Sequence, residues 1–322
     1  MSEEIKNKSS KVKAWISAMR LRTLPLSFSN ILLGTALAFG VIKGTWSELS
    51  LPWGTFTLIL ITTLLLQILS NLANDYGDAK KGADNEGRIG PERAIQSGVI
   101  SPKEMLIGII ITAILSLIFG IWLLLEAFDY NLSWTFIIFF ILGIAAIAAA
   151  IKYTVGKGAY GYSGLGDLFV FVFFGLLGVM GTFYLEIGGN LTWLIVLPAI
   201  TMGCFSVAVL NLNNMRDREN DQKVGKNTVV VKLGFKKSKV YHYSLFAIAY
   251  LAFPIPMVVL SFSQGGSITL LAFVPTAIIH FIHLRKVYRT TDPKDFDPEL
   301  KKVALSAFLF SLLFFIMVVF VD

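Results

Sequence analysis

The sequence predicts an all-α membrane protein, a polytopic bundle of about nine transmembrane helices with a cytoplasmic N-terminus. Three observations lead to this class. Of the 322 residues, 55% are hydrophobic and only 15% are charged, whereas soluble domains carry about 25% charged residues. The apolar residues form continuous runs that approach or exceed the ~20 residues needed to cross a bilayer. Basic residues are concentrated in alternate connections between these runs. A water-soluble domain is therefore excluded.

The spans follow from the runs themselves. Each run is nearly free of charge, and none alternates polar and apolar residues as a barrel strand does. In hydrocarbon the backbone must satisfy its own hydrogen bonds, so continuous apolar runs form helices. The nine runs cover residues 24–43, 53–74, 105–127, 133–151, 165–187, 191–214, 241–262, 267–284 and 303–321.

The basic residues set the orientation of these spans. Of the 28 lysines and arginines, 27 fall in connections on one side, and only Lys43 falls on the other. Connections rich in Lys and Arg stay in the cytoplasm, so the N-terminus is predicted inside and the C-terminus outside. The inner face carries 27 basic and 16 acidic residues, a net charge of +11. This charge favours anionic lipids or anionic substrates.

The segment before the first span is expected to be an interfacial helix. Four lysines precede Trp15, and Arg20 and Arg22 follow it. The segment lacks the short apolar core and small-residue cleavage site of a signal peptide. We therefore divide the chain into a cytoplasmic or interfacial segment at residues 1–22 and a transmembrane domain at residues 23–322.

An acidic motif follows the second apolar run. Asn71, Asp75 and Asp78 are separated by four and three residues, so they share one face if the helix continues. Asp84 follows in the next connection. The motif therefore places carboxylates at the cytoplasmic end of a span.

A second motif of the same kind follows the sixth run. Asn213, Asp217 and Asp221 are each four residues apart and also share a helical face. Carboxylates at a helix C-terminus face the negative end of the helix dipole and repel one another. A solvated helix end with surface ion pairs would explain one such motif, but two on the same membrane face favour a jointly held divalent cation.

The composition selects the kind of cation. The chain has one cysteine, Cys204, and three histidines, so a thiolate or imidazole metal site is not expected. Oxygen ligands favour Mg²⁺, with Mn²⁺ as the other choice. Mg²⁺ takes one or two carboxylates and completes its shell with water and phosphate oxygens. The two motifs therefore predict a diphosphate substrate, with Arg93 and Lys226 as the basic residues nearest to them.

This combination predicts a reaction. Cations that hold a diphosphate stabilise the charge that develops on it as it leaves. A polyprenyl chain enters from lipid between apolar helices, and aromatic faces shelter the allylic cation that forms. An electron-rich aromatic ring then attacks this cation. The sequence thus indicates prenyl transfer within the membrane, with no nucleic-acid partner.

The same residues resemble the UbiA superfamily of intramembrane aromatic prenyltransferases. The resemblance covers Arg20 to Gly234 and is closest to the menaquinone branch, the 1,4-dihydroxy-2-naphthoate polyprenyltransferases. It is carried by the two Asp motifs and by the stretch Arg-Ile-Gly-Pro-Glu-Arg at residues 88–93. Lys-Tyr-Thr-Val-Gly-Lys at residues 152–157 and Gly-Lys-Asn-Thr at residues 225–228 add to it.

The resemblance implies a specific activity. A polyprenyl group would pass from an all-trans polyprenyl diphosphate to 1,4-dihydroxy-2-naphthoate with loss of CO₂, giving demethylmenaquinone. The enzyme would lie in the bacterial plasma (inner) membrane as a multi-pass protein, with its active site facing the cytoplasm. Two alternatives stay open: another aromatic acceptor, such as 4-hydroxybenzoate or homogentisate, and a non-enzymatic cation transporter.

The resemblance also implies roles for individual residues. The expected Mg²⁺ ligands are Asp75, Asp78, Asp84, Asp217 and Asp221. The expected diphosphate ligands are Asn71, Arg22, Arg93, Lys157, Lys226 and Asn213. Asp75, Asp78, Asp217 and Asp221 are expected to be catalytic, together with Tyr153 near the reacting allyl carbon. Asp167 is a candidate for the base that deprotonates the naphthol. Either Asp78 or Asp84 can be the main partner of Asp75, because Asp78 follows Asp75 by three residues rather than the superfamily's four.

Overall fold

The structure, a computed structural model, describes residues 2–45, 51–85, 87–188, 193–255 and 271–321. Within these ranges every regular element is a helix. The elements, in chain order, are α1 (Ser2–Met19), α2 (Leu24–Thr45), α3 (Trp53–Lys80), α4 (Pro102–Ala127), α5 (Trp134–Lys152), α6 (Gly166–Val170), the π-helix η3 (Phe171–Gly181), α7 (Thr182–Ile187), α8 (Trp193–Lys223), α9 (Val229–Ala252), α11 (Phe273–Arg289), α12 (Phe296–Ile316) and the π-helix η6 (Met317–Val321).

The described part of each apolar run lies in helical structure, and α6, η3 and α7 together form the fifth. Among the described residues, six helices are long and apolar enough to cross a membrane, or seven if the bent pair α1 and α2 forms one span. The described part of α11 has only 17 residues, and the first half of α9 carries several lysines. The all-helical membrane fold is confirmed, whereas the number nine stays a prediction.

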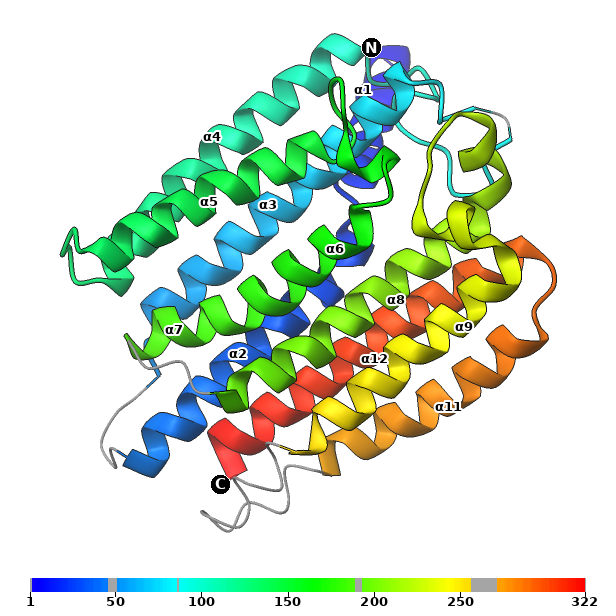
Figure 1. Cartoon of the computed structure of the whole chain (residues 1–322). Coiled ribbons are helices and arrows are strands. Elements are labelled where there is room, and N and C mark those ends of the chain that lie inside the picture. The colour runs from blue at the N-terminus through cyan, green and yellow to red at the C-terminus, as the bar shows by residue number, and fades with distance from the viewer. Residues whose placement is uncertain (1, 46–50, 86, 189–192, 256–270, 322) are drawn as a thin grey trace.

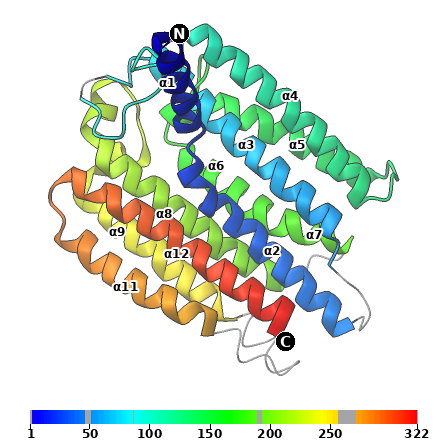
Figure 2. The ribbon, with the colours of Figure 1, turned by 180° about the vertical axis from the view of Figure 1, so that it is seen from behind.

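The helices form two groups (Figures 1 and 2). Helices α3, α4 and α5 lie together on one side, and α8, α9, α11 and α12 lie together on the other. Between the groups lie α2 and the α6–η3–α7 helix, which contact each other. The N- and C-termini lie at opposite ends of the bundle.

The helices differ in how much of their apolar stretch is buried inside the protein. This share is 72% in α8, but only 22% in α4 and 11% in α5. The exposed side chains of α4 and α5 include Ile107, Ile114 and Ile141. Because these side chains would be unfavourable in water, α4 and α5 present them to lipid.

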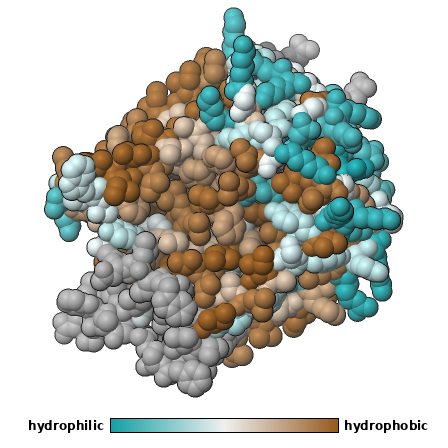
Figure 3. Space-filling view, in the orientation of Figure 1, coloured by the Kyte–Doolittle hydropathy of each residue, from teal (hydrophilic) through white to brown (hydrophobic). Residues whose placement is uncertain are grey.

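Polar residues gather at one end of the molecule, next to a broad hydrophobic surface (Figure 3). This end carries α1 and the connections that follow α3, α8 and α11 (Figure 1). Helix α1 packs there against α3, and the Trp15 ring lies against Gly108 of α4. The placement of residues 1–22 in the lipid headgroup region stays a prediction.

Two local features position the helices around the later site. Ser101 caps the N-terminus of α4 in a capping box with Glu104, so the long connection after α3 ends at a defined residue. In η3, Gly175 approaches α8 so closely that a Cβ atom there would lie 2.6 Å from Gly203 Cα. Only a residue without a side chain permits this helix contact.

We therefore expect Gly175→Ala to lower the thermal unfolding temperature in detergent, because the added methyl group forces η3 and α8 apart at a cost of about 1–3 kcal/mol. Gly143→Ala in α5 is the matched control, since a Cβ there meets no atom within 4 Å. Equal unfolding temperatures for the two variants would contradict the close contact.

Candidate active site

The first acidic motif occupies the last turns of α3 and is buried. Asn71, Asp75 and Asp78 are 4%, 1% and 3% exposed. The helix continues beyond the apolar run to Lys80 and places these side chains on one face. The Asn71 side-chain amide donates a hydrogen bond to the Met19 carbonyl oxygen at 3.0 Å, which ties α3 to the end of α1.

Arg93 is the centre of this end of the protein. The guanidinium lies 2.9 Å from Asp75 Oδ1 through Nη1, 3.2 Å from Asp78 Oδ2 through Nη2 and 3.1 Å from Asp84 Oδ1 through Nε. Burial by itself lowers the pKa of Arg93, but the three carboxylates outweigh it and raise that pKa above its ordinary value. Arg93 therefore stays charged and compensates three acidic groups at once.

A second arginine on Asp75 was not among the predicted site residues. Arg20 donates a hydrogen bond to Asp75 Oδ1 and forms an ion pair with it. Its backbone is in the left-handed region, at φ 49°, which is unfavourable for a residue with a side chain and is often found at functional sites. The sequence signal that could have identified Arg20 is its position, a basic residue just before the first apolar run. The side chain of the predicted Arg22 lies outside the described residues.

The second motif ends α8 and has its own arginine. Arg216 donates to Asp217 Oδ2 at 2.7 Å and to Asn213 Oδ1 at 2.8 Å. It also pairs with Asp297, at the start of α12. Arg216 was not predicted as a site residue either, because its partners Asn213 and Asp217 were expected to face a ligand. In this structure their oxygens accept hydrogen bonds from Arg216.

The two motifs meet through Lys226. Its Nζ lies 3.9 Å from Asp78 Oδ2 and 3.8 Å from Asp221 Oδ1. Tyr162, another residue not predicted, donates a hydrogen bond of 2.7 Å to Asp78 Oδ1. The Asn220 amide donates to the Ala83 carbonyl oxygen at 2.9 Å. Segments about 140 residues apart in the sequence thus form one charged site.

Three other predicted residues lie around this centre. Tyr153 packs edge-to-face on Tyr160, with 5.3 Å between the ring centroids. Lys157 is exposed in the following connection and forms no ion pair with the described residues. Asp167 begins α6 and accepts a hydrogen bond of 3.0 Å from Tyr241. The structure therefore brings Tyr153 to the site but leaves Lys157 in solvent.

The oxygen ligands suit a divalent cation. Among the described residues no three His, Cys, Asp or Glu side chains are close enough to hold one metal ion. Mg²⁺ does not need such a cluster, because it takes one or two carboxylates together with water and phosphate oxygens. The Asp84 side chain is only 1% exposed, and its Oδ1 forms ion pairs with Arg93 and Arg88. Neither of its oxygens accepts a hydrogen bond within the described structure, so this carboxylate has capacity left for a cation.

The pKa of Asp84 supports the same interpretation. Burial raises it to about 6, although the Arg93 charge opposes the shift. Burial also lowers the pKa of Arg88, which lies 3.5 Å from Asp84 Oδ1, to about 10. A buried carboxylate that is costly to ionise gains from a bound cation, which favours its charged form.

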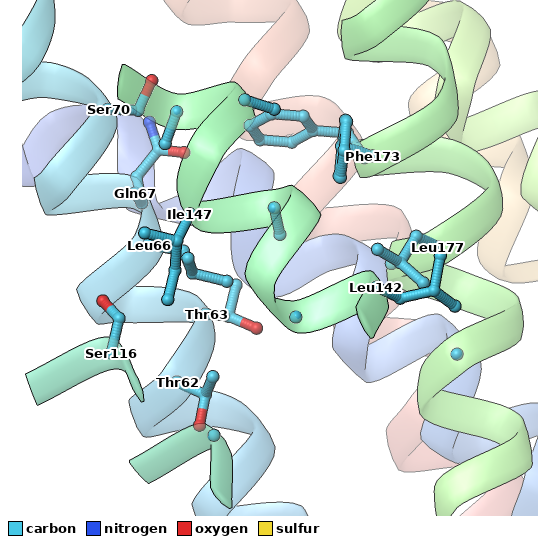
Figure 4. Close-up of a pocket in the computed structure, with 18 of the residues that line it drawn as sticks. Thr62, Thr63, Leu66, Gln67, Ser70, Ser116, Leu142, Ile147, Phe173 and Leu177 are labelled. Atoms are coloured by element: carbon cyan, nitrogen blue, oxygen red, sulfur yellow. The ribbon is translucent and has the colours of Figure 1, made fainter. Parts of the chain in front are cut away.

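A cavity of about 360 Å³ opens next to the charged site. It lies between α2, α3, α4, α5 and η3, and Asn71, Asn74 and Tyr153 line the end near the carboxylates. Apolar side chains such as Phe173, Leu142 and Leu177 line another side (Figure 4). A cationic and acidic mouth on a largely apolar cavity suits a molecule with a polyanionic head and a hydrocarbon body.

Comparison with known proteins agrees with this geometry. Residues 32–313 match the UbiA prenyltransferase family. A 1,4-dihydroxy-2-naphthoate octaprenyltransferase from Haemophilus influenzae is 44% identical over 94% of this chain and 95% of its own length. A protein of the same name from Escherichia coli is 43% identical over 95% and 94%.

A solved structure has the same fold. The UbiA homolog from Archaeoglobus fulgidus bound to DMAPP and Mg²⁺ superposes with a TM-score of 0.58. It covers 94% of this chain and 99% of its own, at 19% sequence identity.

We expect Arg93→Gln to lower the free energy of unfolding by about 3 kcal/mol or more, because it leaves buried carboxylates without their shared cation. Added Mg²⁺ should restore part of this stability by replacing the lost charge. Thermal unfolding in detergent with and without Mg²⁺ measures both effects.

Lys11→Gln is the control for this variant, since the Lys11–Glu104 ion pair is exposed to solvent and such pairs contribute little to stability. If Arg93→Gln unfolds at the same temperature as Lys11→Gln, Arg93 does not hold the site together.

Proposed function

The chain belongs to the UbiA prenyltransferase family, and on this premise we propose that it transfers a polyprenyl group from an all-trans polyprenyl diphosphate to 1,4-dihydroxy-2-naphthoate. The observation that carries this acceptor is the 44% identity, over 94% of the chain, to a relative named for it. The charged mouth and the apolar cavity suit the two ends of the prenyl donor.

The proposed reaction forms one carbon–carbon bond. The bond between the allylic carbon and the diphosphate oxygen breaks, and its electron pair leaves with the diphosphate. The allylic carbon bonds to the electron-rich ring, and the ring carboxylate departs as CO₂. The products are inorganic diphosphate, CO₂ and the quinol form of demethylmenaquinone. This places the enzyme in menaquinone biosynthesis.

The charged residues form two groups, those that bind the prenyl donor and those that hold the metal. Arg20, Arg93 and Lys226 bind diphosphate oxygens, because their cationic groups lie beside the carboxylates that would hold the metal ion. Asn71, Asn213 and Arg22 are proposed as further diphosphate ligands, whereas Lys157 lies in solvent and is not retained. Asp75, Asp78, Asp84, Asp217 and Asp221 would hold Mg²⁺, or Mn²⁺ in its place. When bound, this ion neutralises charge that develops on the leaving diphosphate.

The aromatic side chains shelter the allylic cation. Tyr153 and Asn74 both line the cavity. Asn74 lies one helical turn before Asp78 on α3. Tyr160 packs edge-to-face on Tyr153. It also stacks on Phe169, with 3.9 Å between the Tyr160 and Phe169 ring centroids. The electron-rich faces of such rings attract a cation, so this group favours the charge that develops at the allylic carbon.

The chain is a multi-pass membrane protein, and we place it in the bacterial plasma membrane with the active site facing the cytoplasm. The site lies at the end that carries the basic connections, which stay on the cytoplasmic side. An acceptor such as 4-hydroxybenzoate or homogentisate would use the same donor site. A cation transporter is disfavoured, because its carboxylates should face a cavity at mid-membrane, whereas Asp75 and Asp78 lie at the end of α3.

We expect membranes containing the protein to form prenylated naphthoquinol from Mg²⁺, polyprenyl diphosphate and 1,4-dihydroxy-2-naphthoate. Asp75→Asn and Asp217→Asn should each lower turnover by about 100-fold or more, because a carboxylate that would hold the Mg²⁺ on the diphosphate is lost. Mass spectrometry of the product and size-exclusion chromatography of each variant measure activity and folding.

Glu219→Gln serves as the control for these carboxylates, since the Glu219 side chain is 73% exposed at the same helix end and should keep wild-type turnover. If 4-hydroxybenzoate gives a prenylated product and the naphthoate gives none, the proposed acceptor is overturned.

Removal of divalent cations should abolish turnover without unfolding the protein. The buried arginines continue to compensate the carboxylates, so EDTA is expected to leave the unfolding temperature within a few degrees of its starting value while product formation stops. Mg²⁺ added back should restore activity. Full turnover in excess EDTA would exclude a metal requirement.

A further inference from the structure

The arginine of the second acidic motif is shared between two carboxylates that are far apart in the sequence. Arg216 donates to Asp217 from Nε at 3.2 Å and from Nη2 at 2.7 Å. Its remaining nitrogen, Nη1, donates to Asp297 Oδ1 at 2.5 Å. Asp297 is the second residue of α12 and belongs to neither acidic motif. One buried positive charge is therefore divided between a predicted metal ligand and a carboxylate from the last long helix.

The hold of Arg216 on Asp217 opposes metal binding at that carboxylate. Both Asp217 oxygens accept hydrogen bonds from the guanidinium, and such two-point pairs between arginine and a carboxylate are strong. The Arg216 side chain is only 3% exposed, so water screens this attraction little. A divalent cation at Asp217 therefore competes with Arg216 for the same negative charge.

Asp297 weakens this competition. With Asp297 present, the cluster of one arginine and two aspartates has a net charge of −1, whereas Arg216 and Asp217 by themselves would be neutral. A negative cluster attracts a divalent cation and a neutral pair does not. The next basic group, Lys301 Nζ, lies 4.0 Å from Asp297 Oδ2 and is largely exposed, so it compensates Asp297 only weakly.

Arg216 is confined on its other sides. A Cβ atom on Gly90, in the connection after α3, would lie 2.7 Å from Arg216 Nη2. Asn213 Oδ1 accepts a hydrogen bond of 2.8 Å from the same nitrogen. The guanidinium is thus held beside Asp217 by the first connection and by α8. The contact of Nη1 with Asp297 determines how much of its charge is directed away from Asp217.

A cation can reach Asp217 beside this arginine. Arg216 and Asp217 both line a cavity of about 300 Å³, together with Thr291 and Pro293 from the connection between α11 and α12. Mg²⁺ keeps several water molecules when it binds a protein, and a cavity of this size has room for a hydrated ion.

We propose that Asp297 is a positioning residue for the metal site: acting through Arg216, it keeps Asp217 available to hold the divalent cation. This inference rests on the proposed Mg²⁺-dependent prenyl transfer. It gives α12, which carries neither acidic motif, a direct part in preparing the active site.

The first test measures ion binding without substrates. Asp297→Asn keeps the shape of the side chain and an acceptor oxygen but removes its charge. In purified protein in detergent, a titration with Mn²⁺ alone, followed by the loss of the electron paramagnetic resonance signal of the free ion, should show affinity about tenfold weaker than in the wild type. Asp297→Glu should stay within about twofold of the wild type, because the charge is kept.

Asp295→Asn is the matched control. Asp295 lies at the same helix start, so its charge interacts with the α12 dipole as that of Asp297 does. It pairs instead with the exposed Lys286 and does not contact Arg216. This variant should keep wild-type Mn²⁺ affinity.

The second test separates positioning from a structural role. In Asp297→Asn, the Mg²⁺ concentration for half-maximal turnover should rise about tenfold. Turnover at saturating Mg²⁺ should return to within about twofold of the wild type, because excess ion overcomes the competition from Arg216. A merely structural role would instead lower the unfolding temperature and reduce turnover at every Mg²⁺ concentration.

A double-mutant cycle tests whether Asp297 acts through Arg216. Arg216→Gln should bind Mn²⁺ at least as tightly as the wild type, because no guanidinium competes for Asp217. In that background, Asp297→Asn should change the affinity by less than about twofold. If Arg216→Gln does not fold, the comparison of Asp297→Asn with Asp297→Glu and Asp295→Asn still decides the proposal.

The outcomes separate this inference from the proposed function. A wild type that forms no naphthoate product contradicts the proposed function, whereas the Mn²⁺ titration needs no substrate. An active wild type whose Asp297→Asn variant keeps wild-type Mn²⁺ affinity overturns the role of Asp297. Equal losses of affinity in Asp297→Asn and Asp295→Asn, or a full loss in the Arg216→Gln background, also overturn it, because the effect would not pass through Arg216.

Discussion

Charge compensation at the C-terminal ends of α3 and α8 is the constraint on which the remaining structure depends. Asp75, Asp78 and Asp84 lie too deep for water to stabilise them, so Arg93 must reach all three. These contacts hold the connection after α3 against the end of α8, where the Asn220 amide bonds to the Ala83 carbonyl oxygen. They also hold α1 against α3, since Arg20, next to the end of α1, pairs with the same Asp75. Ordering these ion pairs therefore orders much of the polar end of the molecule.

The same compensation prepares the site for a polyanion. In the free protein the arginines and Lys226 are neutralised by carboxylates. Under the proposed function, the carboxylates would hold the divalent cation and the basic groups would bind the phosphate oxygens of a diphosphate. The total charge then changes little, so neither partner is left buried and uncompensated. Lys226 is well placed for this exchange, because it contacts a carboxylate of each motif.

The membrane part of the fold encloses one largely apolar cavity. Helix α8 is packed on most sides and provides a rigid wall, whereas α4 and α5 are exposed over most of their apolar surface. The cavity lies between these regions, where a hydrocarbon chain from lipid would enter under the proposed function. The π-helix η3 lines part of this cavity, and its glycines allow it to approach both α2 and α8. Such close packing holds the cavity walls at a constant separation.

The sequence by itself determined the helical membrane fold, the concentration of basic residues in alternate connections and the acidic motifs at the ends of two spans. These are local properties, since hydropathy and helical spacing depend only on neighbours in the chain. Only the tertiary structure decided which cation meets which carboxylate. The pairing of Arg20 with Asp75, the Tyr162 hydroxyl on Asp78 and the exposure of Lys157 could not be predicted, because helical spacing does not specify which neighbouring helix a face meets.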